Sequence, residues 1–104
     1  MARVVTDNAE LHRYELNIDG ELAAFADYRL DAGLLEVTRT ESLPEFAGTG
    51  AARQLVTEML DDAHGRALAV LPHCSYVAAI IRKNPSDYLD LVPVDRRAEF
   101  DLPA

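Results

Sequence analysis

The spacing of apolar residues changes in the middle of this 104-residue chain, and the change limits the folds that the chain can adopt. In the first half apolar and polar residues alternate, as over 13–19, which is typical of half-buried strands. Asp19-Gly20 is a strong two-residue hairpin signal. Strands predicted over 21–30 and 34–43 complete an antiparallel meander, and residues 1–8 indicate either a poorly ordered start or a short edge strand.

Beyond residue 44 the pattern becomes helical. From Gly50 to His64 the apolar residues follow a period of 3.6, which predicts a helix with Gly65 as the residue that stops it. The continuous apolar run over 67–71 is typical of a strand buried on both faces. Together these segments predict a βαβ unit with parallel strands. Helical segments over about 75–82 and 87–91 follow, so we expect an α+β fold in one domain, residues 1–104.

Charge and composition exclude several classes of partner. The formal net charge of -8 argues against nucleic acid or an anionic membrane surface, since both need a basic face. It is compatible with a cationic amine, although surplus acidic residues also serve simply to keep a small protein soluble. No apolar run approaches the roughly 20 residues of a membrane span. One cysteine and no signal-peptide pattern make a cytoplasmic location the default, and the three histidines show no metal-ligand spacing.

Gly48-Thr49-Gly50 lies between a predicted strand and the start of the predicted helix. The first N–H groups of a helix have no partner within it and carry the positive end of its dipole. Glycine lets a ligand approach the backbone, so this segment predicts a phosphate or pyrophosphate site that even an acidic protein can use. The alternative is that the two glycines only turn the chain. The dinucleotide fingerprint is excluded because Arg53 stands where its third glycine belongs.

Residues 44–52, read as PEFAGTGAA and followed by Leu55-Val56, resemble motif A of the GNAT acetyltransferases, which cradles the pyrophosphate of acetyl-CoA. With Thr40-Glu41, LPHCSYV over 71–77 and RKNP over 82–85, nearly the whole chain is similar to a small, stand-alone GNAT-like N-acetyltransferase family of YjdJ type. The resemblance implies a GNAT-like fold, with an antiparallel meander, a βαβ unit and C-terminal helices. It also implies acetyl transfer from acetyl-CoA to an amine.

The resemblance further implies which residues bind the cofactor. They are Leu43, Phe46, Ala47, Gly48, Thr49, Gly50, Ala51, Lys83 and Asn84. Arg82, Lys83 and Asn84 would lie near the adenosine end of CoA, where a 3′-phosphate needs a cation; alternatively they form a charged helix C-terminus favoured by the dipole.

Two positions depart from the family pattern. Glu45 replaces the Gln or Arg of motif A, so that side chain adds no positive charge beside the pyrophosphate. Arg39 replaces a histidine, and a guanidinium cannot act as a base, although it can orient an acyl group or a substrate carboxylate. Both departures support an alternative reading as a non-catalytic CoA-binding or protein-interaction module on the same fold. A third reading is a small interaction domain without a cofactor.

The catalytic candidates are Cys74, Glu41, Arg39 and Tyr76. The resemblance gives Cys74 a catalytic or acyl-carrying role, and a helix N-terminus favours the reactive thiolate, whereas the alternative is a small buried hydrophobe. His73 could act as a base or stabilise that thiolate. Glu41, or Glu36 on the same strand, could take the amine proton, and Tyr76 could protonate the departing CoA thiolate or be a core aromatic. We expect a monomer, or a homodimer paired through the exposed hairpin edge.

Overall fold

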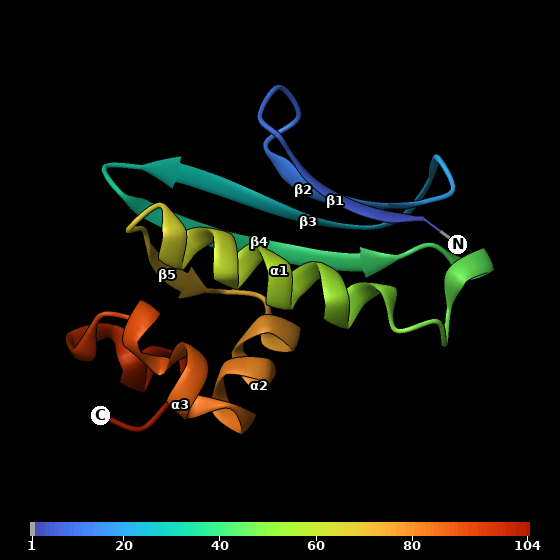
Figure 1. The fold of residues 1–104 in the computed structure, drawn as a ribbon. Helices are drawn as coiled ribbons and strands as arrows, with labels where there is room; N and C mark the ends of the chain where they lie inside the picture. Colours follow the sequence, from blue (N-terminus) through green and yellow to red (C-terminus); the bar gives the residue numbers. More distant parts are fainter. Residues whose placement is uncertain (1) are drawn as a thin grey trace.

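The structure is a computed structural model that describes residues 2–104, and its centre is a five-stranded sheet with the strands in sequence order (Figure 1). The strands are β1 (Arg3–Asn8), β2 (Arg13–Ile18), β3 (Glu21–Asp31), β4 (Leu34–Ser42) and β5 (Ala69–Pro72). The first four strands pair antiparallel, and β4 and β5 pair parallel. The predicted α+β class, with a meander followed by a βαβ unit, is therefore confirmed. Residues 3–8 form the edge strand.

Helices cover one face and one end of this sheet. The long helix α1 (Ala51–Gly65) connects β4 to β5 and lies across the sheet (Figure 1). After β5 come α2 (Ser75–Lys83), α3 (Pro85–Tyr88) and two 3-10 segments, Leu89–Leu91 and Val94–Phe100. A third 3-10 turn, Pro44–Phe46, precedes α1. None of the helices within residues 2–104 is long and apolar enough to cross a bilayer.

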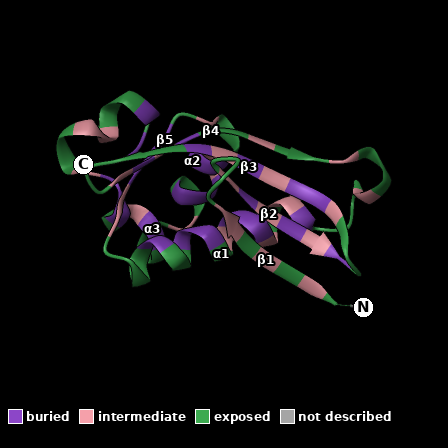
Figure 2. Cartoon of the chain, turned by 90° about the horizontal axis from the view of Figure 1, so that it is seen from above, coloured by how far each residue is buried: buried purple, intermediate pink, exposed green. Residues whose placement is uncertain are grey.

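The core lies between α1 and the sheet. Buried positions alternate along β2 and gather along α1 (Figure 2). The large side chains that are fully buried include Tyr14, Leu16, Leu35, Val37, Leu55, Val56, Met59 and Leu60. Each aliphatic one contributes about 1.5–3 kcal/mol by leaving water. The C-terminal segment, residues 94–104, packs against the core through Phe100, which is only 9% exposed and anchors the segment.

A bulge in β4 decides which side chains face α1. Val37 pairs with Tyr28 and Arg39 pairs with Asp27, so Thr38 is an extra residue. Beyond it the alternation shifts by one position. Thr40 and Ser42 lie opposite the buried Ala26 and Ala24 and share the α1 face. Arg39 and Glu41 consequently lie on the opposite, open face of the sheet.

The predicted helix stop was wrong by two residues. Gly65 belongs to α1, and Ala67 takes the left-handed conformation with a φ of 56°. The amides of Ala67 and Leu68 donate to the carbonyls of His64 and Ala63, which is the hydrogen-bond pattern of a Schellman motif. Because the helix extends further, β5 begins at residue 69 rather than 67.

Candidate functional site

The two parallel strands β4 and β5 separate part-way along their length. Their pairing begins at Leu34 with Ala69 and ends at Val37 with Pro72. One more backbone hydrogen bond follows, 3.0 Å from the amide of Cys74 to the carbonyl of Val37, before the chain turns into α2. Residues 38–42 of β4 therefore pair with β3 alone, and their other edge faces an opening beside the first turn of α2.

A hollow of about 290 Å³ lies at the end of this opening. Its walls are Ser42 of β4, Phe46 and Gly48 of the loop, the first turn of α1, and Tyr76 of α2. The structure thus brings the glycine loop together with Tyr76, which the sequence predicted separately. Tyr76 is 41% exposed, so it forms a wall of the hollow and is not a core aromatic.

The backbone of the loop explains its two glycines. Gly48 and Gly50 have φ values of 80° and 78°, which an L-residue adopts only with strain. A Cβ at either position would meet no atom within 4 Å, so the space in front of the loop is open. Thr49 holds the turn, because its hydroxyl donates to the carbonyl of Phe46 at 2.6 Å and accepts from the amide of Ala51 at 3.3 Å. The amides of Thr49 and Ala51 are thus paired within the loop, while the side of the loop where a glycine Cβ would stand is open.

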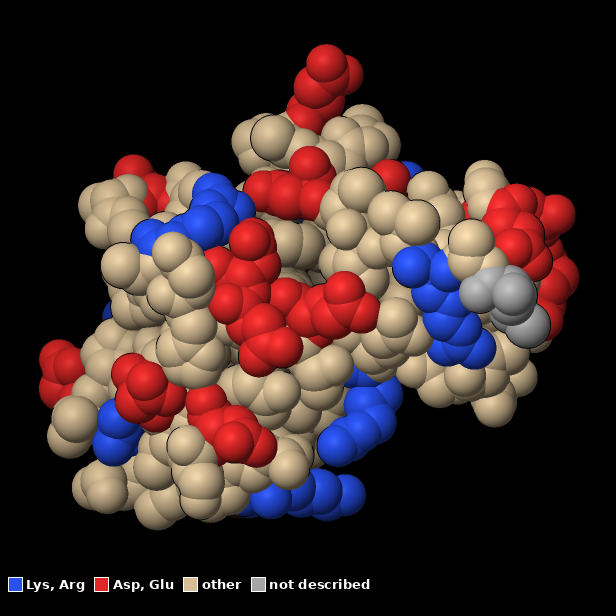
Figure 3. All heavy atoms as spheres, in the orientation of Figure 1, with Lys and Arg blue, Asp and Glu red and all other residues tan. Residues whose placement is uncertain are grey.

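Two arginines bring positive charge to the loop. Arg3 reaches across from β1 and donates to the carbonyl of Thr49 and to Oε1 of Gln54, both at 3.1 Å. Arg53 lines the hollow itself, whereas Glu45 is exposed and does not line it. Figure 3, in the orientation of Figure 1, shows acidic side chains gathered over the middle of the molecule, with basic ones around them. Sequence reasoning missed Arg3, since no local pattern signals a contact across 46 residues.

Cys74 lies at the inner end of the opening. Its thiol is half-buried and donates to the hydroxyl of Thr40 at 3.4 Å, across the gap between β4 and α2. Thr40 faces α1, so the thiol lies on that side of the sheet. Cys74 is thus accessible to a group placed in the opening.

Arg39 and Glu41 do not join Cys74. They form an ion pair with each other on the open face, and the Arg39 guanidinium lies over the ring of Phe25, 5.5 Å from its centroid. The four catalytic candidates are therefore divided between the two faces of β4.

Comparison with known proteins decides the family. The sequence model described as GCN5-related N-acetyl-transferase matches residues 13–91, most of the chain. The chain belongs to this family. The crystal structure of the ribosomal-protein-S18-alanine N-acetyltransferase from Escherichia coli has a similar fold, with a TM-score of 0.52 and 22% identity. That match covers 56% of this chain and 38% of the other, so this GNAT chain spans well under two thirds of its neighbour. No curated protein matches it.

On the open face of this GNAT fold, His73 pairs with Glu36. Nε2 of His73 lies 3.0 Å from Oε1 of Glu36, which also accepts from Arg29 at 3.3 Å. The hydrogen bond with His73, aided by Arg29, lowers the pKa of the Glu36 carboxyl below its ordinary value. His73 and Cys74 are neighbours in sequence, yet their hydrogen-bond partners lie on opposite faces of β4. The structure therefore gives no thiolate partnership between them.

The basic segment at the end of α2 lies away from the hollow. Lys83 is about 10 Å along the helix axis from Tyr76, at 1.5 Å per residue. The side chain of Asn84 donates to the carbonyl of Ile80 at 2.9 Å, and Arg82 donates to the carbonyls of Phe100 and Asp101. These contacts cap α2 and hold the C-terminal segment, and a contact of Lys83 or Asn84 with CoA stays a prediction.

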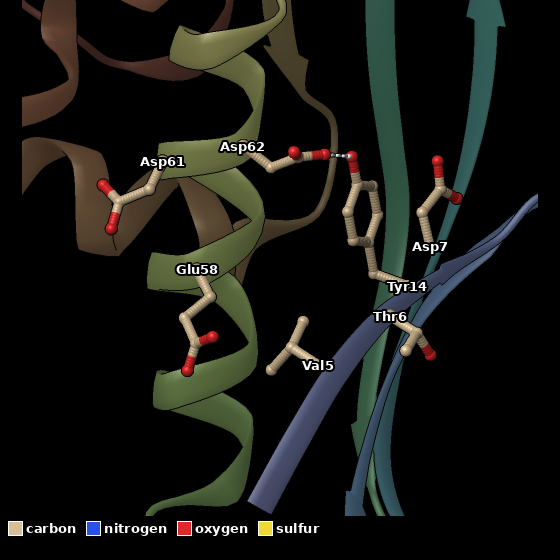
Figure 4. A pocket seen from close by; sticks show the side chains of 7 residues that line it. All are labelled: Val5, Thr6, Asp7, Tyr14, Glu58, Asp61 and Asp62. Carbon is tan, nitrogen blue, oxygen red and sulfur yellow. Dashed lines mark hydrogen bonds between the residues drawn. The ribbon is translucent and has the colours of Figure 1, made fainter.

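A larger hollow, of about 490 Å³, separates β1 from α1 (Figure 4). It is lined by Val5, Thr6, Asp7, Tyr14, Glu58, Asp61 and Asp62. The hydroxyl of Tyr14 donates to Asp62, and the hydroxyl of Tyr28 donates to Asp7, both at 2.5 Å. Arg66 forms ion pairs with both carboxylates. This network fastens the edge strand to the helix. Its acidic lining disfavours an anion in this hollow.

Within residues 2–104 no group of three or more His, Cys, Asp or Glu side chains is arranged to hold a metal ion.

Proposed function

We propose that this GNAT-family chain transfers an acetyl group from acetyl-CoA to an amine. The observation that carries the proposal is the hollow that joins the glycine loop, the first turn of α1 and the opening between β4 and β5. Acetyl-CoA supplies an acetyl group activated as a thioester. A pyrophosphate fits the loop, because free space lies in front of Gly48 and Gly50 and the amides at the start of α1 have no acceptor within the helix.

In this proposal the loop residues 43–51 hold the phosphates through their backbone, and the two arginines near the loop add charge. Arg53 lines the hollow that would hold the ligand, while Arg3 donates to the carbonyl of Thr49 and offsets its partial negative charge. Tyr76 lies on the opposite wall, from which its hydroxyl can protonate the departing thiolate. Lys83 and Asn84 are proposed for the adenosine end.

Two chemical routes are proposed for the transfer. In the first, the amine attacks the thioester directly, with Glu41 or a water molecule taking its proton and Arg39 orienting the acyl group. In the second, Cys74 carries the acetyl group before the amine receives it. Cys74→Ala separates the routes, since full activity in that variant rules out the covalent one, and a loss of a hundredfold or more supports it.

A second candidate is a GNAT-type module that binds CoA without catalysis. The ion pair between Arg39 and Glu41 favours this candidate, because each side chain neutralises the charge that the other would present to a substrate. Binding of acetyl-CoA without turnover over a broad panel of amines would support this candidate.

Thermal unfolding with and without acetyl-CoA tests the cofactor site, with adenosine as the control. A ligand at a hundred times its Kd stabilises the folded state by about 2.7 kcal/mol, which raises the Tm of a domain of this size by several degrees. We expect such a shift with acetyl-CoA and none with adenosine. If millimolar acetyl-CoA leaves the Tm unchanged, the enzymatic function is rejected in favour of an interaction module.

A further inference from the structure

A third hollow, of about 260 Å³, lies between α2 and the C-terminal segment. Its lining includes Pro72, His73, Ser75, Ala78, Glu99 and Phe100. Ser75 and Ala78 are three residues apart and share one side of α2, whereas Tyr76 lies about 100° around the helix and lines the hollow at the glycine loop. The first turn of α2 therefore separates two hollows. His73 lines the hollow beside the C-terminal segment, and Cys74 follows it directly before α2.

The contacts of His73 fix its tautomer. A carboxylate only accepts hydrogen bonds, so Nε2, 3.0 Å from Glu36, carries the proton in the neutral ring. Nδ1 is then left with a lone pair, and no donor within residues 2–104 reaches it. The ring also packs edge-on against Phe100, with centroids 5.3 Å apart. His73 is thus an oriented base, 37% exposed, with its accepting nitrogen free.

The other proton acceptors near the opening are occupied. Glu41 is held by Arg39, which cannot accept a proton itself. Cys74 donates to Thr40 on the other face of β4. We propose that His73, oriented by Glu36, takes the proton of the acceptor amine, and that the amine lies in the hollow between α2 and the C-terminal segment. This inference rests on the proposed function.

A primary amine arrives as its ammonium ion and gives one proton to Nδ1 of His73, directly or through water. The nitrogen lone pair then forms the C–N bond with the carbonyl carbon of the thioester, while the C–S bond breaks and its electron pair leaves on sulfur. The second proton of the nitrogen goes to that sulfur, which departs as the thiol. His73 returns its proton to solvent.

The walls of the hollow suggest which amine it accepts. Pro72, Ala78 and Phe100 provide apolar surface, and the Arg82 guanidinium is turned to the carbonyls of the C-terminal segment. Glu36 on β4 and Glu99 on the C-terminal segment both lie near His73, although each is already paired with an arginine. We therefore infer a primary amine with a short apolar substituent. Phe100 lies beyond the residues that the family model matches.

His73→Ala tests the proposal, with n-butylamine as the acceptor and release of the CoA thiol as the assay. We expect kcat to fall by about 10²–10⁴-fold, the usual contribution of a general base. The thermal shift with acetyl-CoA should stay, and added imidazole should restore part of the rate. His64→Ala is the matched control, because His64 pairs with Asp90 at 3.1 Å and is 36% exposed, but lies at the end of α1. It should leave the rate unchanged.

A second measurement needs no turnover. In the wild-type protein saturated with CoA, n-butylammonium should shift the ¹⁵N resonance of Nδ1 in His73 and leave that of His64 in place. In the Glu36→Gln variant the His73 ring should become a mixture of tautomers, because the glutamine amide can both donate and accept a hydrogen bond. A thermal shift with acetyl-CoA combined with an unresponsive His73, or with full activity in His73→Ala, would overturn this inference and leave the proposed function standing. Absence of the thermal shift would overturn both.

Discussion

Gly50 begins α1 in a conformation that only glycine adopts without strain, and it also borders the hollow. These two properties can be separated, because Gly33 in the turn between β3 and β4 has a similar φ of 80° and equally open surroundings. An alanine at either position should destabilise the fold by about 1–2 kcal/mol through backbone strain alone.

Only Gly50→Ala also places a methyl group where a phosphate must approach the backbone. We expect this variant to lose most of the thermal shift with acetyl-CoA, while Gly33→Ala keeps it. Melting curves of both variants, each with and without acetyl-CoA, provide the measurement. Equal shifts in the two variants would show that no anion approaches the loop at Gly50.

The buried tyrosines predict how stability depends on alkaline pH. Burial, and then the hydrogen bond to Asp7, raises the pKa of Tyr28 from 10.0 to about 12, and burial raises the pKa of Tyr14 as well. An unfolded tyrosine loses its proton from about pH 10, whereas the folded one still holds it. The folded state therefore keeps this contribution below pH 10 and loses it as the pH rises through 12.

Urea unfolding at several pH values between 8 and 12 measures this dependence. Tyr28→Phe should be less stable than the wild type at pH 8, because Asp7 loses a donor. Its free energy of unfolding should then fall less steeply above pH 10. A variant curve parallel to that of the wild type would show that Tyr28 ionises alike in both states.

At the scale of elements, β1 connects the edge of the sheet to the glycine loop. Arg3 makes both of its side-chain hydrogen bonds to residues of the loop and of α1. Arg3→Met keeps the length of the side chain and removes the charge. We expect a loss of stability below about 1 kcal/mol, since the contact is only partly buried, but a several-fold increase in the Kd for acetyl-CoA.

Calorimetric titration of acetyl-CoA into each variant provides the comparison, with Arg13→Met as the control. Arg13 lies on the open face of β2, paired with Glu15 and stacked on Phe25, so its loss should leave the Kd unchanged. If both substitutions raise the Kd equally, the effect comes from net charge and not from the loop.

The sequence predicts elements better than it predicts contacts between them. The meander, α1 and β5 follow from apolar periods of 2 and 3.6, which are local properties of the chain. The bulge at Thr38 leaves no comparable signal, although it decides that Arg39 and Glu41 face away from Cys74. The reach of Arg3 to the loop likewise depends on how the sheet edge lies against α1. Composition predicts where the glycine loop lies, but only the strand register shows that the candidate residues divide between the two faces of β4.

For the molecule as a whole, the net charge of -8 conflicts with an anionic ligand. The acidic side chains along α1 include Glu58, Asp61 and Asp62, and of these Asp62 is paired with Arg66. Figure 3 shows that acidic side chains form the central cluster on this side of the molecule. Backbone amide dipoles act only at short range, and the arginines beside the loop are outnumbered by carboxylates, so the protein as a whole does not attract an anion from a distance. Long-range repulsion should therefore slow association.

Ionic strength distinguishes the long-range repulsion of the ligand from the short-range contacts in the glycine loop. The Debye length falls from about 30 Å at 0.01 M to about 8 Å at 0.15 M, which screens the distant carboxylates more than the contacts in the loop. We expect the association rate of acetyl-CoA, measured by stopped flow, to rise several-fold over this range, while the dissociation rate changes little. Arg3→Met should show a steeper rise, because it removes one of the few attractive charges. An association rate that falls with salt would mean that the arginines beside the loop, rather than its amides, control the approach of the ligand.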